Sequence, residues 1–352
     1  MENQLVFLRL LGVLSGAILM LWSFGRFRTH FIRRREFFLM SLFGVALITV
    51  AAVPNSINIV AGMLSLEDKA LGRLIMLLVF SNLLLWVLIF GLRSKDTQKS
   101  FQFDLLVRKL ALKSFAQSRG GLNGIKEITV IIPALNEAEN LDIVLPKMPR
   151  AVAGRELGVL VVDDGSTDNT VEVVKSHGYP VVSNPINRGG GAALRLGYDI
   201  AAMGGASVVV TMDGDGQHLP EEIALLVGPI LADKADIVIG SRVLGRREKD
   251  SAFRWVGIHV FTFVINILAG THITDCSNGF RAFRVSSLQK LLLLQDQFHT
   301  AELIIDAARK GIRISDAPVT VLRRLSGDSK KGQNWSYGLN FSKTVLKTWL
   351  RK

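Results

Sequence analysis

The amino-acid sequence predicts an α/β domain, in which helices flank a mostly parallel sheet, preceded by an α-helical transmembrane domain. Two observations predict this order. Three apolar stretches dominate the first 92 residues, whereas short β-branched runs alternate with helical patterns from residue 127 onward. The composition fits such a division: 49% of the 352 residues are hydrophobic and the mean hydropathy is +0.33, yet 20% of the residues are charged.

Each apolar stretch has about the length needed to cross a hydrocarbon core of roughly 30 Å. The stretches occupy residues 5–24, 37–60 and 72–92. A cleaved signal peptide is the alternative for the first stretch. That stretch, however, lacks a basic region before it and a small-residue cleavage site before the arginines that follow it. We therefore expect three transmembrane helices.

The cations between these stretches predict their orientation. Five arginines separate the first two stretches, whereas the next loop carries Lys69 and Arg73, offset by Glu67 and Asp68. Because cytoplasmic loops are enriched in Lys and Arg, we expect the amino terminus outside and everything after residue 92 in the cytoplasm. The protein is thus predicted to be integral to a bacterial-type inner membrane or its equivalent.

Four segments are predicted along the chain. Residues 1–95 form the transmembrane domain, and residues 96–124 form a juxtamembrane amphipathic helix and a glycine-rich linker. Residues 125–330 form the α/β domain, and residues 331–352 form a C-terminal interfacial amphipathic helix. The alternative for the helix within 96–124 is a helix that packs on the protein. The alternative for the helix at 331–352 is a solvated surface helix.

The α/β domain follows from the alternation of strand and helix patterns. Strands are predicted at residues 127–132, 159–162, 180–183, 208–212 and 237–239, and helices at 137–151, 168–177, 190–203 and 220–232. Ligands of such sheets bind beyond the carboxyl ends of the strands. The residues that follow each strand are therefore the candidates for function.

Polar residues follow these strands one after another. Asn136 and Glu137 follow the first strand, Asp163 and Asp164 follow the second, and an Asn-Arg-Gly-Gly-Gly run at 187–191 follows the third. The fourth ends in Asp-Gly-Asp-Gly-Gln-His at 213–218, and the fifth ends near Arg242. Any one cluster could be turn chemistry. Their repetition at one edge of a sheet indicates a binding site.

Asp213 and Asp215 have the chemistry of a metal site. Two carboxylates separated by one glycine can both reach a hard cation, and Mg²⁺ or Mn²⁺ binds through one or two carboxylates together with substrate phosphates. Gln217 could add a carbonyl ligand, whereas His218 is expected to be a hydrogen-bonding neighbour. The sequence thus predicts a divalent cation that holds a phosphate-bearing ligand.

The net charge and the cysteine content limit the classes of partner and of metal site. Lys and Arg outnumber Asp and Glu by 42 to 30, a net charge of +12, which favours anionic partners such as nucleic acid, a membrane surface or a phosphorylated substrate. Charge alone does not choose among these three. The single cysteine, Cys276, excludes an intrachain disulfide and a cysteine-rich metal site.

An ordered set of motifs resembles family 2 glycosyltransferases. The motifs are VIIPALNEAEN at 130–140, VVDDGSTDNT at 161–170, MDGDGQH at 212–218, IGSR at 239–242 and DCSNGFR at 275–281. Within the family they resemble the polyprenyl-phosphate sugar synthases, which include dolichyl-phosphate mannose synthase. The resemblance covers about residues 127–330. The N-terminal third is similar to a three-span membrane domain found beside such enzymes.

The resemblance implies a GT-A-type fold and a role for each matched residue. Pro133, Asn136, Glu137 and Asp163 or Asp164 would hold the nucleoside of a nucleotide sugar. Asp213, Asp215 and Gln217 would bind Mg²⁺ or Mn²⁺. Arg242, helped by Arg254, would meet the acceptor phosphate, although Ile258 stands where related synthases often have a serine. The 275–281 motif, with Arg281, would shape the donor-sugar side, and Glu302 matches a position that is usually acidic.

The implied activity is the inverting transfer of a hexose from a UDP- or GDP-sugar to a membrane lipid phosphate, above all polyprenyl phosphate. Such a phosphate is ionised near neutral pH, so it needs positioning more than a strong base. Asp215, Arg242 and Arg254 are the expected catalytic residues. The expected partners are the nucleotide sugar, the lipid acceptor and the membrane, with no nucleic acid; formation of a homo-oligomer stays open.

Other functions fit the sequence less well. A glycerolipid or another membrane lipid is the main alternative acceptor. A processive polysaccharide synthase would carry a Gln-x-x-Arg-Trp motif, and the Arg254-Trp255 pair lacks the upstream glutamine. A dinucleotide-binding dehydrogenase would place its glycines after the first strand rather than the third. A non-catalytic scaffold would leave the acidic edge unexplained. The apolar run at 255–269 is either a buried helix or a wall of the acceptor groove.

Overall fold

The computed structural model describes most of the chain and divides it into two compact units, Met1–Phe101 and Gln102–Lys352. The described residues are 2–28, 34–53, 78, 81–82, 85, 102–117, 122–248, 252–296, 299–325, 341–342, 344–346 and 348–349.

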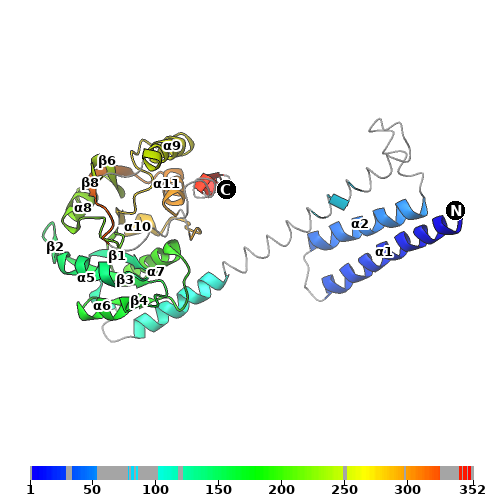
Figure 1. Cartoon of the computed structure of the whole chain (residues 1–352), viewed down its shortest axis with the longest axis horizontal. Coiled ribbons are helices and arrows are strands. Elements are labelled where there is room, and N and C mark those ends of the chain that lie inside the picture. The colour runs from blue at the N-terminus through cyan, green and yellow to red at the C-terminus, as the bar shows by residue number, and fades with distance from the viewer. Residues whose placement is uncertain are drawn as a thin grey trace. The chain divides into compact units, whose positions relative to one another are not determined.

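In the described part of the N-terminal unit, α1 (Glu2–Arg28) and α2 (Arg34–Ala52) pack side by side (Figure 1). Small residues allow the close approach: a Cβ added to Gly16 would lie 2.7 Å from the Gly44 carbonyl oxygen. Among the described residues, no helix has both the length and the apolar character needed to cross a membrane. The predicted spans are therefore not confirmed, and the third apolar stretch lies almost wholly outside the described residues.

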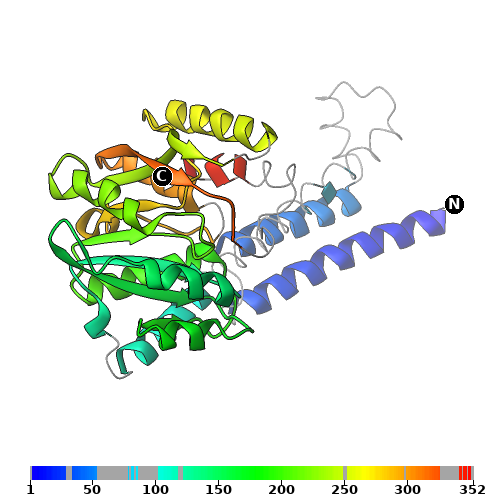
Figure 2. The ribbon, with the colours of Figure 1, turned by 60° about the vertical axis from the view of Figure 1, so that its left-hand side comes forward.

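The second unit is built on an eight-stranded sheet in the order β2-β3-β1-β5-β7-β6-β8, with β4 paired to β3 (Figures 1 and 2). The strands are β1 (Ile128–Ala134), β2 (Ala151–Val152), β3 (Arg155–Asp163), β4 (Val181–Ser183), β5 (Val208–Thr211), β6 (Ile237–Arg247), β7 (Arg281–Arg284) and β8 (Ile314–Val321). β1 is parallel to β3 and β5, and β6 is parallel to β8, whereas β7 runs antiparallel between β5 and β6. This is the predicted mostly parallel α/β fold.

Helices cover both faces of the sheet. They are α5 (Ala138–Val144), α6 (Thr170–Ser176), α7 (Gly190–Met203), α8 (Ile223–Leu231), α9 (Ala252–Ala269), α10 (Val285–Leu288) and α11 (His299–Arg309), with 3₁₀ turns at Leu122–Gly124, Leu145–Lys147 and Pro220–Glu222. Alternate residues of β1 enter different cores because side chains alternate across a strand. Ile131 packs with α7 and α11, whereas Val130 and Ile132 pack with α5 and α8.

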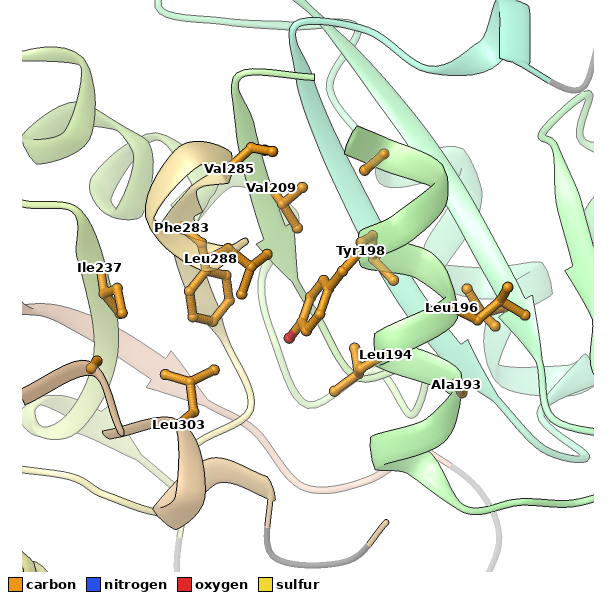
Figure 3. Packing of buried hydrophobic residues seen from close by; sticks show 14 of the residues in the cluster. Ala193, Leu194, Leu196, Tyr198, Val209, Ile237, Phe283, Val285, Leu288 and Leu303 are labelled. Carbon is orange, nitrogen blue, oxygen red and sulfur yellow. The ribbon is translucent and has the colours of Figure 1, made fainter. Parts of the chain in front are cut away.

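The core on the α7 side is centred on aromatic and aliphatic side chains from distant parts of the chain (Figure 3). Tyr198 of α7 meets Phe283 of β7 edge to face, with their ring centroids 5.9 Å apart. Because this core joins α7 to β7 and α11, it fixes the ends of the loops that lead into α7 and β7.

The predicted amphipathic helix occupies residues 102–117 and belongs to the second unit. Val107, Ala111 and Phe115 are buried, and the last two pack into the α7 core. Phe103, Leu106 and Leu110 form a second apolar stripe, and each is about half-exposed. The helix therefore packs on the protein with one face and leaves another apolar face uncovered.

α9 and the helical residues near the C-terminus lie at the periphery of the second unit. In Figures 1 and 2, α9 lies along one edge, and its Phe263 and Ile267 are each 65% exposed. The inner face of α9 contacts the helical residues near the C-terminus, where the ring centroids of Phe261 and Phe341 are 4.4 Å apart. α9 is therefore not the fully buried helix of the first alternative, and its role as a wall of the acceptor groove stays a prediction.

The bounds predicted for the helices were correct for one helix and wrong for another. The helix at 190–203 has the predicted bounds, whereas the helix predicted at 137–151 ends at Val144 because Pro146 and Pro149 cannot continue an α-helix. The prediction missed β2, β7, β8, α10 and α11.

Candidate active site

Three parallel strands bring the polar residues of distant segments to one edge of the sheet. Ala134 at the end of β1 is paired with Asp163 at the end of β3, and Ile131 is paired with Thr211 at the end of β5. The residues that follow β1, β3 and β5 are therefore neighbours in space, as predicted.

Asn136 joins the first two clusters. Its Oδ1 atom accepts a hydrogen bond from the backbone amide of Thr167 at 2.8 Å. The backbone amide of Asn136 donates to the Ser166 hydroxyl at 2.9 Å. Asn136 has φ +51°, a left-handed conformation that is uncommon outside glycine. Contacts from the loop after β3 stabilise this strained position, which directs the chain from β1 into Glu137.

Asp163 and Asp164 hold different loops. Asp163 Oδ1 accepts from the Ser166 amide at 2.9 Å, which closes the turn after β3. Asp164 accepts from the amides of Arg188 (3.0 Å) and Gly189 (2.6 Å) and from the Asn184 side chain (2.9 Å). Burial raises the pKa of Asp164 above its ordinary value, and these hydrogen bonds oppose the shift. Asp164 therefore positions the loop at 188–191, which we call the glycine loop.

The turn after β5 presents Asp213 and Asp215. His218 supports it from behind: its Nδ1 accepts from the Asp213 amide (3.3 Å), its Nε2 lies 3.0 Å from Asn278 Oδ1, and its ring stacks on Phe280. An acceptor at Nδ1 leaves the proton on Nε2, which fits donation to the Asn278 carbonyl oxygen. His218 is thus the hydrogen-bonding neighbour that the sequence predicted.

The segment 275–281 spans the site from Asp213 to Arg242. A Cβ added to Gly279 would lie 2.9 Å from Asp213 Oδ1, so glycine at this position leaves the carboxylate room where it lies. At the other end, Arg242 Nε lies 2.6 Å from Asp275 Oδ2 and Arg242 Nη2 donates to the Ser277 hydroxyl at 3.0 Å. One short segment therefore fixes both the acidic turn and the arginine.

Arg324 supplies a cation at the acidic edge that sequence analysis missed. Its Nη2 donates to Glu137 Oε1 at 2.9 Å, and its Nε lies 3.3 Å from Asp215 Oδ2. The Leu325 amide also donates to the Asp215 carbonyl oxygen, so the chain after β8 crosses the turn. No local pattern predicts this contact, because 187 residues separate Arg324 from Glu137.

Four predicted residues are placed less directly. Pro133 lies within β1, opposite Val162. The side-chain nitrogen Nε2 of Gln217 donates to the Leu322 carbonyl oxygen at 2.9 Å, and a metal contact from Gln217 is not confirmed. Arg254 lies in α9, but its side chain is outside what the structure describes. Glu302 is buried and accepts from the Leu294 and Gln295 amides, both at 2.9 Å.

Arg281 corrects a prediction. Its guanidinium is 2% exposed and donates to the backbone carbonyl oxygens of Asn278, Cys276 and Thr300. Desolvation lowers its pKa from the ordinary value of an arginine. An arginine buried in this way holds the 275–281 segment in place from beneath and does not reach a donor sugar.

The donor set fits a divalent cation that is shared with a phosphate ligand. The pKa of Asp215 is raised by burial and then by the nearby Asp213 carboxylate, which is the electrostatic setting that a cation relieves. Across the described ranges, no group of three or more His, Cys, Asp and Glu side chains is arranged to hold a metal ion. Two carboxylates alone match the way Mg²⁺ is held with substrate phosphates rather than in an all-protein cage.

Comparison with known proteins decides the family. The model described as glycosyl transferase family 2 matches residues 129–292. A polyprenol monophosphomannose synthase of Mycolicibacterium smegmatis is 32% identical over 213 residues, which cover 57% of this chain and 79% of the relative. The chain belongs to glycosyl transferase family 2. It is accordingly a glycosyltransferase, and the resemblance seen in its motifs is confirmed at the level of the family.

Two further relatives are similar to more than half of the chain. A UDP-N-acetylglucosamine–dolichyl-phosphate N-acetylglucosaminyltransferase of Methanococcus voltae is 30% identical over 219 residues, covering 56% of this chain and 86% of the relative. An undecaprenyl-phosphate mannosyltransferase of Micrococcus luteus is 30% identical over 218 residues, covering 58% and 86%. The names of these relatives specify sugar transfer to dolichyl or undecaprenyl phosphate.

A solved structure supports the GT-A-like fold. Glucosyl-3-phosphoglycerate synthase of Mycobacterium tuberculosis, crystallised with Mn²⁺, UDP-glucose and phosphoglyceric acid, superposes with a TM-score of 0.52 and 22% identity. The match covers 65% of this chain and 83% of that one. At this identity, the likeness concerns the fold.

Proposed function

We propose that this glycosyltransferase transfers a hexose from a UDP- or GDP-linked sugar to a membrane lipid phosphate, polyprenyl phosphate above all, with inversion at the anomeric carbon. The segment 275–281 carries the proposal. Gly279 leaves room for the Asp213 carboxylate, and Asp275 and Ser277 hold the guanidinium of Arg242. A group suited to a cation-bound diphosphate and a group suited to a second phosphate thus lie at the two ends of one segment.

On the donor side, Asn136, Glu137 and Asp163 would hold the nucleoside, and Asp164 would position the glycine loop beside it. Asp213 and Asp215 would hold Mg²⁺ or Mn²⁺ together with diphosphate oxygens, and a cation there neutralises charge on the leaving group. Arg324, which already contacts Glu137 and Asp215, adds a positive charge at the same place.

On the acceptor side, Arg242 would orient the phosphate, with Arg254 as a second cation. An oxygen of the acceptor phosphate attacks the anomeric carbon as the bond from that carbon to the diphosphate oxygen breaks. The acceptor is already ionised, so no protein base has to remove a proton. The result is one displacement, inversion and no glycosyl-enzyme intermediate.

The lipid character of the acceptor is supported by exposed apolar faces. Val256, Val260, Phe263 and Ile267 of α9 lie on one helical face and are 51–65% exposed, and the stripe of Phe103, Leu106 and Leu110 adds a second face. The names of the relatives agree with a polyprenyl acceptor. We further propose that the N-terminal unit associates with the membrane and that the second unit is cytoplasmic, on the strength of the cation distribution between the apolar stretches.

A transfer assay tests the function. Membranes containing the chain would be incubated with labelled UDP- and GDP-sugars, Mn²⁺ or Mg²⁺, and either polyprenyl phosphate or diacylglycerol. Label should enter polyprenyl phosphate, and the Asp215→Ala variant should lose at least ~10³-fold in rate. Label in diacylglycerol would favour the glycerolipid alternative. No transfer from any tested donor by a folded chain would refute the proposal.

A further inference from the structure

The helix at 102–117 reaches the glycine loop through a buried carboxylate. Asp104 Oδ1 accepts from Arg188 Nη2 at 3.2 Å and from Arg195 Nη2 at 3.1 Å. The side chains of Asp104 and Arg188 are each 12% exposed, and that of Arg195 is 7% exposed. Because these charges are largely removed from water, losing one partner would leave the others poorly compensated.

Arg188 is held by the same helix in a second way. Its guanidinium carbon lies 5.2 Å from the centroid of the Phe103 ring, within the range of a cation–π contact. The backbone amide of Arg188 donates to Asp164, as does that of Gly189. Arg188 therefore connects the helix at 102–117 directly to a carboxylate of the proposed donor pocket.

The opposite side of the glycine loop is fixed independently. The Gly191 amide donates to the Asp296 carbonyl oxygen at 2.9 Å, and Arg195 donates to the Gln295 carbonyl oxygen and pairs with the Asp296 carboxylate. The buried Glu302 in turn holds the 294–295 backbone. The glycine loop is thus clamped between the 294–296 segment and the helix at 102–117.

We propose that Asp104 is a positioning residue for nucleotide-sugar binding, and that docking of the helix at 102–117 and occupation of the donor pocket stabilise each other. This inference rests on the proposed function. Without Asp104, Arg188 loses this carboxylate, and the backbone amides that Asp164 accepts are no longer held from the outer side. Coupling between two binding events is reciprocal, so a bound nucleotide must also strengthen docking of the helix.

A simple structural role for the helix makes a different prediction. Arg108 of the same helix pairs with Asp199 of α7 at 3.4 Å and so fastens the helix at a point beyond the glycine loop. If Asp104 only fastened the helix, then Arg108→Gln and Asp104→Ala would affect nucleotide binding alike. Coupling through Arg188 requires that Asp104→Ala weaken nucleotide binding and that Arg108→Gln leave it unchanged.

Calorimetry with UDP and with GDP, each with Mn²⁺, would measure nucleotide affinity in the full chain. Asp104→Ala and Arg188→Gln should each raise the Kd of the bound nucleotide about tenfold, and the double variant should be no worse than either single one. Arg108→Gln should stay within about twofold of the unchanged chain. Hydrogen exchange should show that nucleotide slows exchange at 102–117, except in the first two variants.

The outcomes separate the two claims. If Asp104→Ala and Arg188→Gln both bind nucleotide as tightly as the unchanged chain does, and exchange at 102–117 is insensitive to nucleotide, the coupling is overturned while the proposed function stands. A folded, unchanged chain that binds neither nucleotide would overturn the proposed function and the coupling with it. Should Asp104→Ala fail to fold, Arg188→Gln and the exchange measurement on the unchanged chain decide the question.

Discussion

The Nε atom of Arg242 lies 2.6 Å from the Oδ2 atom of Asp275, whose side chain is fully buried. The same guanidinium donates to Ser277, so two partners fix its plane. A lysine could not reproduce this geometry, because its ammonium is a point charge on a flexible stem. The pair therefore fixes the orientation of Arg242, the residue that we propose for the acceptor phosphate.

Arg242→Lys should lower kcat/KM for the lipid phosphate about 100-fold, because the bidentate, oriented contact is lost. The affinity for UDP or GDP should change by less than about twofold. Arg246→Lys, at an exposed position of the same strand, serves as the control. Equal losses in both variants, or a loss confined to nucleotide affinity, would contradict the acceptor role.

Gly279→Ala tests the fit around Asp213. The new Cβ would lie 2.9 Å from Oδ1 and 3.1 Å from Oδ2, so the carboxylate has to move. Turnover should fall about tenfold or more, and half-maximal activity should need more Mn²⁺. Gly228→Ala in α8 meets nothing within 4 Å and should leave both quantities unchanged. Normal Mn²⁺ dependence in Gly279→Ala would exclude Asp213 as a ligand.

The exposed face of α9 is expected to serve lipid rather than stability. Phe263→Glu should reduce transfer to polyprenyl phosphate in vesicles about tenfold, because it places a charge on an apolar face. It should not affect binding of UDP or GDP. Leu225→Glu in α8, at a similarly exposed leucine, is the matched control. Unaltered transfer by Phe263→Glu would remove α9 from the lipid site.

Asp236 makes stability depend on pH far from the site. Hydrogen bonds from Arg313, and then from Arg284, lower the pKa of this carboxyl from 3.8 to about 2. A lowered pKa means that the stabilisation is present above about pH 4 and disappears as the pH falls towards 2. Asp236→Asn should cost roughly 1 kcal/mol at pH 7, since Arg313 is partly screened by water. Denaturant titrations should show the difference vanishing near pH 2; a constant difference would be contrary to this account.

Local patterns were sufficient to predict β1, β3, β4, β5 and β6 and the acidic edge, but not β2, β7 or β8. Asn136, Asp163 and Asp213 each follow a short apolar run, and the parallel pairing of β1, β3 and β5 necessarily brings such positions together. Glycine at 279 and histidine at 218 also lie within recognisable motifs, so their neighbourhood could be expected.

Long-range ion pairs and buried arginines could not be read from the sequence. Arg324 meets Glu137, and Asp104 meets Arg188, across 187 and 84 residues respectively, and no periodicity predicts such contacts. Arg281 was expected at the sugar because its motif surrounds the site. Its own side chain, however, turns into the core, where three backbone carbonyl oxygens satisfy it. A motif thus located the segment but not the direction of each side chain.

The mass of the lipid product tests the central claim most directly. The full chain in vesicles with polyprenyl phosphate, Mn²⁺ and the donor that it binds should convert the lipid into a species heavier by one hexosyl residue, with its single phosphate retained. The anomeric configuration should be opposite to that of the donor. An unchanged lipid phosphate alongside release of free sugar, or a product with retained configuration, would contradict the account.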